Sequence, residues 1–427
     1  MATRPPALVV RSVVTTTWQV RGLGPDEVRA FLAVDELGFH LSRSPEDEAV
    51  ELSLLEQDRT LVAVDPAAPR DLAGVAATYS HVMTLPGGPA PVAGLTWVSV
   101  HPAARRRGVL SALMRHHLHG LHGEGREPVA ALWASEAAIY GRFGYGAASR
   151  QVGLTVPRGP RALVPAPDDP ALRVRLAGDD EPLERLERVY DAERLRRPGV
   201  HARDERWRRA ALFVPPPERA GRTPLRTVVV EDGAGARAYG RYQVEPRWSA
   251  AGADGVVHVR EAFATDPAAY AALWRFLCDL DLTASVHVRP RPTDDPLLDL
   301  LVDVRGAQPT LGDALYVRLV DLERALPARA YAGEVDLVLE VADPLCPWNA
   351  GRWRLAAGPG GAAVERTSAP ADLALGTREL GAAYLGAAGA LARLAAAGRV
   401  EERTAGALVR ASRAFSWDVQ PWSPAVW

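Results

Sequence analysis

The sequence predicts an α+β protein built from three domains. The chain has 427 residues, which at about 150 residues per domain corresponds to about three domains. Over the first two thirds of the chain, short apolar runs alternate with helical patterns. In the last third, several predicted strands precede two alanine- and leucine-rich helices. Strands followed by a separate group of helices are typical of an α+β layer.

We place the domains at residues 1–156, 157–309 and 310–427. A cluster of prolines follows Val156, and proline at that density is typical of a connecting segment. The first two domains have similar sizes and a similar order of predicted elements. This similarity suggests a duplication that is visible in structure rather than in residue identity.

The predicted elements follow from apolar periodicity and turn residues. In the first domain they are strands at Leu61–Val64, Leu72–Tyr79, Leu95–Val100 and 128–134, and a helix at Val109–Leu121. In the second they are strands at Leu172–Leu176, Leu225–Glu231, Arg237–Val244, Val256–Phe263 and Ala284–Val288, with helices at Glu181–Leu195 and Tyr270–Leu280. In the third they are strands at Leu315–Leu319, Val335–Val341 and Trp353–Ala357, with helices at Arg378–Ala397 and Ala405–Phe415.

The composition excludes several classes of protein and partner. Hydrophobic residues make up 48% of the chain and charged residues 24%, which excludes disorder and collagen-like repeats. The 50 basic and 52 acidic residues give a net charge of -2, so we expect neither nucleic acid nor a membrane as a partner. The chain has no lysine, and therefore only the placement of an arginine is informative.

The cysteines and the N-terminus favour a cytoplasmic protein. Cys278 and Cys346 are too few for a disulfide framework and fit a reducing compartment. The segment Met1–Arg11 is too short and too rich in Arg and Pro for a signal peptide. The sequence also lacks an apolar run of about 18 residues, which a membrane-spanning helix needs.

The segment from Leu95 to Leu110 carries the strongest chemical signal. An apolar strand is followed by His101-Pro102, then by a run of three arginines, and Gly108 opens an amphipathic helix. A helix N-terminus presents unpaired N–H groups and the positive end of the helix dipole, which together form a cradle for an anion. Glycine lets the backbone approach a phosphate closely, and arginines add charge-assisted hydrogen bonds. The alternative is a solvated basic turn that caps an ordinary helix.

A second apolar strand, 128–134, follows that helix and leads into Ser135–Tyr145. A strand, helix and strand in this order imply parallel strands joined by a right-handed crossover. Both strands then end at the same edge of the sheet, where open parallel sheets bind ligands. We therefore expect the functional site at this edge.

These two segments resemble a known family. The sequence VSVHPAARRRGVLSALM (98–114) is similar to the acetyl-coenzyme A signature of the GNAT superfamily of N-acetyltransferases. The sequence WASEAAIYGRFGYG (133–146) resembles the Eis (enhanced intracellular survival) branch, whose members acetylate aminoglycosides and lysines. Leu110 departs from the small residue that many GNAT proteins have there.

The resemblance implies a fold and an assembly for the three predicted domains. It implies an N-terminal GNAT domain with the acetyl-CoA site, a degenerate GNAT-like domain and a C-terminal domain like sterol carrier protein. The second domain has no R-x-x-G at a helix start, so we expect one cofactor site per chain. The resemblance also implies a cytoplasmic homo-oligomer, because hexamers occur in the family.

The resemblance further implies which residues bind acetyl-CoA. The backbones of Val98 and Val100 would pair with the pantetheine arm, and the Val98 N–H would donate to the thioester oxygen as it becomes an oxyanion. Ser135 would line the cofactor arm. The residues implied to hold the pyrophosphate are Arg105, Arg106, Gly108 and Val109.

The same resemblance implies that Tyr140 is the general acid and that the C-terminal carboxylate of Trp427 is the general base. A phenol with a pKa near 10 can protonate a thiolate with a pKa near 8.5 with little thermodynamic mismatch. A carboxylate with a pKa near 3.5 is too weak a base for stepwise transfer, so we expect it to act through water during the attack. The alternatives are that Tyr140 packs beside Phe143 and Tyr145, and that the apolar tail simply packs on the core.

The substrate implied by the resemblance is a primary amine, on an aminoglycoside, a lysine or another small molecule. Eis-type sites place acidic residues in an N-terminal loop and just before the C-terminus. Here that loop reads Gly38-Phe39-His40-Leu41-Ser42 and the penultimate residue is Val426, so a less charged amine or a protein lysine fits better. The acidic run 46–48 lies nearby in sequence. The alternative function is a non-catalytic acyl-CoA or lipid-binding protein that retains the fold.

Three further features are open to two interpretations. His116, His117, His119 and His122 have helical spacing that could share a metal ion, but a solvated helix face is favoured and no metal is expected. Cys278 lies in an apolar helix pattern and is most simply a buried thiol. The alanine-rich helix at Arg378–Ala397 fits either a lipid groove or close packing on a sheet.

Overall fold

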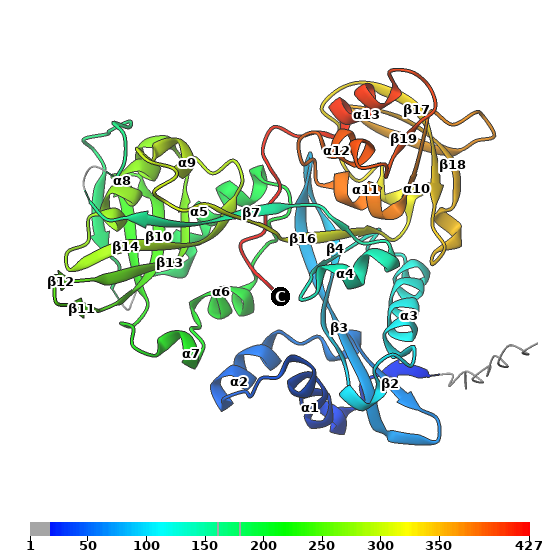
Figure 1. Cartoon of the computed structure of the whole chain (residues 1–427), viewed down its shortest axis with the longest axis horizontal. Coiled ribbons are helices and arrows are strands. Elements are labelled where there is room, and N and C mark those ends of the chain that lie inside the picture. The colour runs from blue at the N-terminus through cyan, green and yellow to red at the C-terminus, as the bar shows by residue number, and fades with distance from the viewer. Residues whose placement is uncertain (1–17, 160–161, 179–180) are drawn as a thin grey trace, which may run out of the picture. The chain divides into compact units, whose positions relative to one another are not determined.

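The computed structural model describes residues 18–159, 162–178 and 181–427. Met1–Arg11, where no signal peptide is expected, lies outside the described residues. The described chain divides into two compact units: 18–42, 56–77 and 97–117 form the first, and the remainder forms the second. Figure 1 labels the elements of both units. None of the described helices is both long enough and apolar enough to cross a bilayer.

The first unit joins antiparallel strands to helices. Strand β1 (Gln19–Gly22) pairs with β2 (Thr60–Asp65), and β2 pairs with the beginning of β3 (Ala68–Leu85). The unit also contains helix α1 (Val28–Phe39) and the start of helix α3 (Val109–Glu124). Three short 3-10 helices complete it, at Pro25–Glu27, Gln57–Arg59 and Pro102–Ala104.

Two glycines of the first unit permit close packing. A Cβ on Gly38 of α1 would lie 1.8 Å from Ser99 Oγ, and that hydroxyl donates a 3.1 Å hydrogen bond to Val34 O. A Cβ on Gly74 of β3 would lie 2.6 Å from Val109 Cγ1, at the first residue of α3. These contacts fix the strand and the helix between which the predicted basic loop runs.

In the second unit, strand β4 (Gly88–Val100), which continues into the first unit, pairs in parallel with β5 (Val129–Trp133). The helix between β4 and β5 is α3, so the predicted parallel pair with a helical crossover is confirmed. Strand β5 then pairs antiparallel with β16 (Leu315–Leu319), and β16 pairs antiparallel with β6 (Gly146–Ala147). A strand from late in the chain therefore continues this sheet.

A second sheet of the same unit has the order β15-β7-β14-β13-β10-β9-β8. Its strands are β7 (Arg150–Pro157), β8 (Arg173–Leu176), β9 (Arg226–Asp232), β10 (Gly235–Glu245), β13 (Gly255–Ala264), β14 (Thr283–Pro292) and β15 (Thr310–Asp313). Strands β13 and β14 are parallel and are joined by helix α8 (Pro267–Cys278). The order β13-α8-β14 repeats the order β4-α3-β5, as the similar element order predicts.

Strands β7 and β16 each pair with strands that belong to a different predicted domain. Strand β7 follows the first domain's elements in sequence and pairs with β14 and β15. Strand β16 opens the predicted third domain and pairs with β5 and β6. Apolar alternation identifies each segment as a strand, but it marks a buried face and does not specify a neighbour.

The third sheet has the order β19-β18-β17-β20-β21, and helices α11, α12 and α13 gather beside it (Figure 1). Its strands are β17 (Val335–Ala342), β18 (Gly351–Gly358), β19 (Gly361–Arg366), β20 (Leu373–Gly376) and β21 (Glu401–Glu402). The single helix predicted over Arg378–Ala397 is wrong: α11 ends at Tyr384 and α12 begins at Ala390. Between them, Gly386 (φ 87°) and Gly389 (φ 63°) are left-handed, which interrupts the helix.

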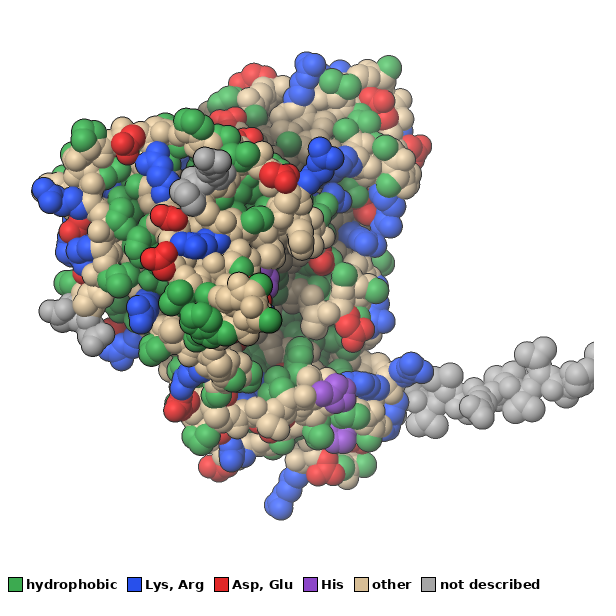
Figure 2. All heavy atoms as spheres, turned by 60° about the vertical axis from the view of Figure 1, so that its left-hand side comes forward, with side chains coloured by type: hydrophobic (Ala, Val, Ile, Leu, Met, Phe, Trp, Pro, Cys, Tyr) green, Lys and Arg blue, Asp and Glu red, His purple; other side chains and the backbone are tan. Residues whose placement is uncertain are grey.

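The remaining elements of the second unit are mostly helices: α2 (Pro45–Leu54), α4 (Ala137–Tyr140), α5 (Leu183–Arg196), α6 (Glu205–Leu212), α7 (Pro216–Arg219), α9 (Leu297–Leu300), α10 (Leu322–Ala325), α11 (Thr377–Tyr384), α12 (Ala390–Ala396) and α13 (Ala407–Phe415), with the short strands β11 (Trp248–Ser249) and β12 (Gly252–Ala253). One apolar core joins β5 and β16 to the third sheet and its helices. Another lies between the second sheet and α8. Arginines and acidic residues are interspersed on the face shown in Figure 2, in agreement with the low net charge.

Gly146 of β6 provides a test of how α11 packs on the first sheet. A Cβ there would lie 1.9 Å from Arg378 O and 2.4 Å from Ala382 N, both of them backbone atoms that cannot rotate away. We expect Gly146→Ala to lower the free energy of unfolding by about 1–3 kcal/mol, the usual cost of overpacking. Denaturant unfolding monitored by circular dichroism measures the change.

Gly120→Ala is the matched control. Gly120 lies in α3, where an added Cβ meets nothing within 4 Å. Alanine is the better helix former, so this variant is expected to be up to about 1 kcal/mol more stable than the parent. Equal stability of Gly146→Ala and the parent would contradict the packing of α11 against β6.

Candidate functional site

The basic loop of the first unit has the backbone geometry of an anion cradle. Arg106 has φ 60° and Gly108 has φ 89°, so the loop turns twice through the left-handed region. A Cβ on Gly108 would meet nothing within 4 Å, and space for a ligand lies beside the backbone. The first hydrogen bond of α3 is donated by Ala112 to Gly108 O. The N–H groups that precede Ala112 at the helix start therefore have no intrahelical acceptor.

The three arginines of this loop differ in their contacts. Arg107 is held in place, because its carbonyl accepts a 2.7 Å hydrogen bond from the Trp18 indole and its guanidinium lies 5.0 Å from the Trp18 ring and 4.0 Å from Asp65. Arg105 donates a 3.4 Å hydrogen bond to Gly38 O. Among the described residues, Arg106 has no side-chain hydrogen bond or ion pair, and it is exposed. Arg106 is thus the guanidinium most available to an anion.

The predicted pantetheine-binding residues, Val98 and Val100, lie at the end of β4. Trp97 has φ 54°, unusual for a bulky residue inside a strand, which locally distorts β4. Ser99 is buried and turned toward α1, where it bonds Val34 O. Side chains alternate along a strand, so Val98 and Val100 face the side opposite Ser99. Both are half-buried.

Tyr140 lies in the second unit, at the end of the short helix α4 that follows β5. It is buried, with 6% of its surface exposed, and its ring centroid lies 6.1 Å from that of Tyr145. Gly144 (φ 83°) then reverses the chain, and the Tyr145 N–H donates to Tyr140 O over 3.3 Å. Ser135 precedes α4 and is exposed.

Burial raises the pKa of Tyr140 to about 12, and the nearby negative charge of Glu136 raises it further. The neutral phenol is therefore favoured over the whole ordinary pH range. A thiol in water has a pKa near 8.5, so donation to a fully solvated thiolate would be uphill by roughly 5 kcal/mol. The small difference in pKa between phenol and thiol that is expected for an unperturbed tyrosine therefore does not apply to Tyr140. Proton donation requires that burial raise the pKa of the thiol as well, or that the proton move as the bond breaks.

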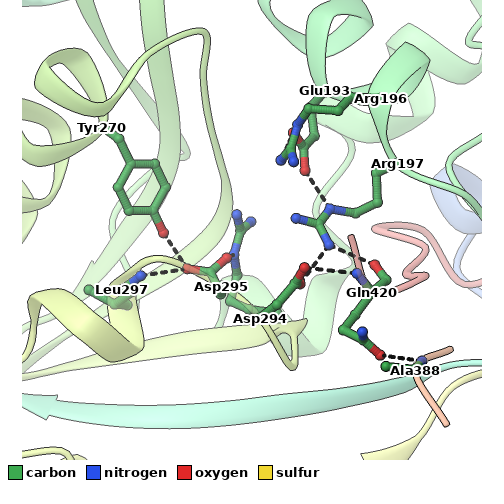
Figure 3. A network of polar contacts seen from close by, with 10 residues as sticks. Glu193, Arg196, Arg197, Tyr270, Asp294, Asp295, Leu297, Ala388 and Gln420 are labelled. Atoms are coloured by element: carbon green, nitrogen blue, oxygen red, sulfur yellow. Dashed lines mark hydrogen bonds and ion pairs between the residues drawn. The ribbon is translucent and has the colours of Figure 1, made fainter. Parts of the chain in front are cut away.

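The tail that leads to Trp427 is fixed by a buried arginine (Figure 3). Arg197 is 2% exposed, and its Nη1 donates to Asp294 Oδ1 and to Gln420 O, both over 2.6 Å. Its Nε donates to Glu193 Oε1 over 2.5 Å. Gln420 completes the arrangement: its N–H donates to Asp294 Oδ2 over 2.8 Å, and its Oε1 accepts from Ala388 N over 3.3 Å.

Two residues further on, Trp422 is locked against the second sheet. Its N–H donates to Pro198 O over 2.9 Å, and its side chain is 3% exposed. The guanidinium of Arg291 lies 4.9 Å from its ring. A Cβ on Gly199 (φ 96°) would lie 2.6 Å from Trp422 O, so glycine is needed for this approach. The tail is therefore docked, as its apolar side chains Phe415, Trp417, Trp422 and Trp427 predict.

The ring of Trp427 packs in a cluster that we call the histidine–tryptophan cluster: Tyr79, His81, His201, Trp207 and Trp427. The Trp427 ring centroid lies 4.6 Å from that of His81 and 5.5 Å from that of His201. Both histidine rings also contact Trp207, at 5.3 and 5.1 Å. Gly94 of β4 completes the contact, since a Cβ there would lie 2.4 Å from the His81 ring and 3.2 Å from Trp427 Nε1.

His201 is neutral and firmly held. It is fully buried, and its pKa is well below the usual value because burial disfavours the imidazolium and His81 lies alongside. Its carbonyl accepts a 2.7 Å hydrogen bond from Tyr190 OH. Sequence reasoning missed the cluster, because His81, His201 and Trp207 come from separate segments with no motif that connects them.

The acidic residues near the predicted substrate loop have protein partners. Glu46 of α2 forms a 2.7 Å ion pair with Arg219 of α7. Asp47 accepts hydrogen bonds from the backbone N–H and hydroxyl of Ser44, and its own N–H donates to that hydroxyl. This is a capping box, a structural role at a helix start. Neither carboxylate is free to hold a second ammonium of a substrate.

The expectation of a solvated face on α3 is wrong for His117, whereas His116 and His119 are exposed and His122 is partly exposed. His117 is buried, and burial lowers its pKa to about 3, with Arg59 as a further cause. His122 stacks on Trp348 with 4.1 Å between centroids, and His119 Nε2 lies 3.0 Å from Leu345 O. The described residues contain no group of three side chains placed to hold a metal ion.

The predicted buried thiol is confirmed at Cys278. The side chain is buried, and burial raises its pKa to about 12. It is therefore an inert core thiol.

Comparison with known proteins finds similarity over the whole chain. Residues 19–148 and 199–319 match two models described as acetyltransferase (GNAT) domain, and residues 322–424 match a model described as sterol carrier protein domain. The chain is 48% identical to an N-acetyltransferase of Streptomyces coelicolor over 82% of this chain and 85% of the relative. It is 35% identical to the N-acetyltransferase Eis of Mycobacterium tuberculosis over 88% of this chain and 91% of the relative.

Solved structures agree with this similarity. The crystal structure of Eis1 from Mycobacterium abscessus superposes with a TM-score of 0.78 at 31% identity, covering 96% of this chain and all of the other. A GCN5-related N-acetyltransferase from Anabaena variabilis has a TM-score of 0.79 at 19% identity, over 96% of this chain and all of the other. The second comparison shows the shared fold.

The raised pKa of Tyr140 predicts a titration that differs from that of an exposed phenol. The folded value of about 12 lies above the unfolded value near 10. The stability contributed by the neutral phenol is thus complete below pH 10 and is lost as the pH rises through 12. The tyrosinate absorbance of the parent minus that of Tyr140→Phe measures this group, and a midpoint near 10 would contradict its burial.

Proposed function

The chain belongs to the Eis family of GNAT N-acetyltransferases, which use an acyl-coenzyme A, and from this premise we propose that it transfers acetyl from acetyl-CoA to a primary amine of low charge. The cosubstrate supplies a thioester that an amine nitrogen can attack. The protein must bind the diphosphate, stabilise the developing oxyanion, accept the amine proton and donate a proton to the departing sulfur.

In this proposal, the loop at the start of α3 binds the diphosphate. Arg106 and Arg105 supply guanidinium donors, and the N–H groups at Gly108 and Val109 supply the helix-start donors. The open space beside Gly108 and the lack of a protein partner for Arg106 among the described residues support this role. Val98 and Val100 pair with the pantetheine arm, Val98 N–H donates to the oxyanion, and Ser135 lines the arm.

Tyr140 acts as the general acid. Its raised pKa supports this role, because the phenol keeps its proton until the sulfur departs. The carboxylate of Trp427 acts as the general base, with a water between it and the amine. The tail contacts from Arg197 to the histidine–tryptophan cluster support a fixed position for this terminus.

One observation carries the proposal: strand β4 carries the proposed thioester-binding residues and also contacts the ring of Trp427. Its segment at Gly94 contacts the His81 and Trp427 rings, and its continuation carries Val98 and Val100 and leads into the arginine loop. A single strand thus connects the proposed thioester-binding backbone to the packing site of the proposed base.

We propose an amine with few positive charges rather than a polycation. On α2, Glu46 is committed to Arg219 and Asp47 to a helix cap. The ring of Trp427 is surrounded by aromatic side chains and the neutral His201, which favour an apolar or aromatic body beside the amine.

The family and the composition support a cytoplasmic homo-hexamer as the working form. Light scattering on the purified full chain tests the assembly.

The first functional prediction concerns Tyr140→Phe. Removing the proton donor is expected to lower kcat by about 10²–10⁴-fold with little change in the KM for acetyl-CoA. Thiol release is measured with a lysine peptide, an aminoglycoside and an aromatic monoamine, and the monoamine is expected to give the highest kcat/KM. Equal kcat for the variant and the parent would remove Tyr140 from this role.

The amine panel also distinguishes the alternative function. If the parent binds acetyl-CoA but releases no thiol with any amine, the chain is an acyl-CoA-binding protein that retains the fold. Tyr145→Phe is the matched aromatic control, because Tyr145 is fully buried beside Tyr140.

The second functional prediction concerns the C-terminal carboxylate. One glycine added after Trp427 moves the carboxylate by about 3.5 Å, and we expect kcat to fall by about 10²-fold while acetyl-CoA affinity is kept. Val426→Ala is the control, because Val426 is 70% exposed and its loss should leave kcat unchanged. Full activity of the extended chain would contradict the role of this carboxylate.

A further inference from the structure

A pocket lies in the C-terminal half of the second unit, apart from the residues proposed for acetyl transfer. Its volume is about 490 Å³, within the range of small-molecule sites. Its walls come from the segment that includes β6 and the start of β7, from Thr293 and Leu311, from helices α11 and α12 with the residues between and after them, and from the tail at Gln420 and Pro421. None of its lining residues belongs to the proposed acetyl-transfer machinery.

The lining is strongly basic. Four arginines contribute to it: Arg150, Arg378, Arg393 and Arg399. Among the described lining residues, Glu379 is the single acid, and it is already engaged. Its Oε1 accepts a 2.7 Å hydrogen bond from Arg399, and its Oε2 accepts the Gly376 N–H over 3.2 Å.

Three of the four guanidinium charges have no carboxylate partner. In the described part of the chain, neither Arg150 nor Arg378 makes a side-chain hydrogen bond or an ion pair, and Arg393 donates only to the carbonyl of Ala388. Burial lowers the pKa of Arg393, and the positive charge of Arg150 lowers it further. Like charges held this close are unfavourable unless an anion lies between them.

The same part of the chain also contributes apolar residues to the lining. Helices α11 and α12, the link between them and the residue that follows α12 contribute Ala382, Ala387, Ala390, Leu394 and Ala397. Short side chains on this alanine-rich wall leave the volume that a ligand body would fill. A pocket lined by both uncompensated cations and short alkyl side chains matches an anionic head joined to an apolar group.

We infer that this pocket binds a small organic phosphate. The dianionic phosphate lies against Arg150, Arg378 and Arg393, and the organic part lies on the alanine-rich wall. A phosphate fits better than a single carboxylate, because three guanidinium groups match two negative charges and several acceptor oxygens.

The position of the pocket connects it to two other parts of the same unit. A Cβ on Gly141, the residue after Tyr140, would lie 2.8 Å from Arg378 Cζ, so this arginine rests on the turn that carries Tyr140. Gln420, which lines the pocket, is also bound by Arg197 and Ala388 (Figure 3). A ligand here would therefore contact the tail at Gln420 and would contact Arg378, which rests on the Tyr140 turn.

The test is calorimetric titration of the full chain with phenyl phosphate. We expect one saturable site per chain, with affinity that falls as salt rises. Inorganic phosphate is expected to bind at least tenfold more weakly, because it lacks the organic part. Benzoate, with one negative charge, is expected to bind more weakly as well.

Variants locate the site. Arg150→Gln combined with Arg393→Gln is expected to weaken phenyl phosphate binding at least tenfold while leaving coenzyme A affinity unchanged. Both arginines are exposed, so an unchanged thermal midpoint will show that the variant folds. Arg305→Gln, at an exposed arginine elsewhere, is the matched control and should bind like the parent.

Arg106→Gln separates this inference from the proposed function. It is expected to weaken coenzyme A binding and to leave phenyl phosphate binding unchanged. No saturable binding of phenyl phosphate by the parent would overturn the inference. So would binding that the double variant retains, binding that Arg106→Gln abolishes, or inorganic phosphate that binds as tightly as phenyl phosphate.

Discussion

The end of the chain depends on one buried guanidinium. Arg197 leaves water almost completely and is compensated by Glu193, by Asp294 and by the carbonyl of Gln420. A buried cation is stable only while such partners remain, so removing one of them weakens the compensation of its charge. The same interaction that satisfies Arg197 therefore holds the tail, and through Trp422 it determines where the Trp427 ring packs.

Charge is distributed unevenly in this molecule, and the distribution separates exposed arginines from buried neutral groups. Exposed arginines with no protein partner among the described residues lie at the α3 loop and in the basic pocket. Tyr140 and His201 are buried instead, and burial keeps both the phenol and the imidazole uncharged. Anions are attracted to the first kind of surface, while the buried groups interact with little screening by water.

The sequence predicted what is encoded locally. The parallel β4–β5 pair and the buried Cys278 follow from periodicity, and the GNAT and sterol-carrier domains follow from the family resemblance that two short motifs carry. What it missed arises from tertiary contact. The histidine–tryptophan cluster brings together rings from distant segments, the alanine-rich pattern conceals the break between α11 and α12, and burial rather than residue type determines the acidity of Tyr140.

The pairing of β16 with β5, which is distant in sequence, has a consequence for biosynthesis. Strand β5 receives its antiparallel neighbour from a segment about 190 residues downstream. At a ribosomal rate of 5–20 residues per second, the growing polypeptide carries an open β5 edge for roughly 10–40 s before that partner emerges. An unpaired edge invites association with other chains, so the nascent protein passes through an aggregation-sensitive interval that the finished molecule no longer shows. Cellular chaperones that occupy exposed strands would act during this interval.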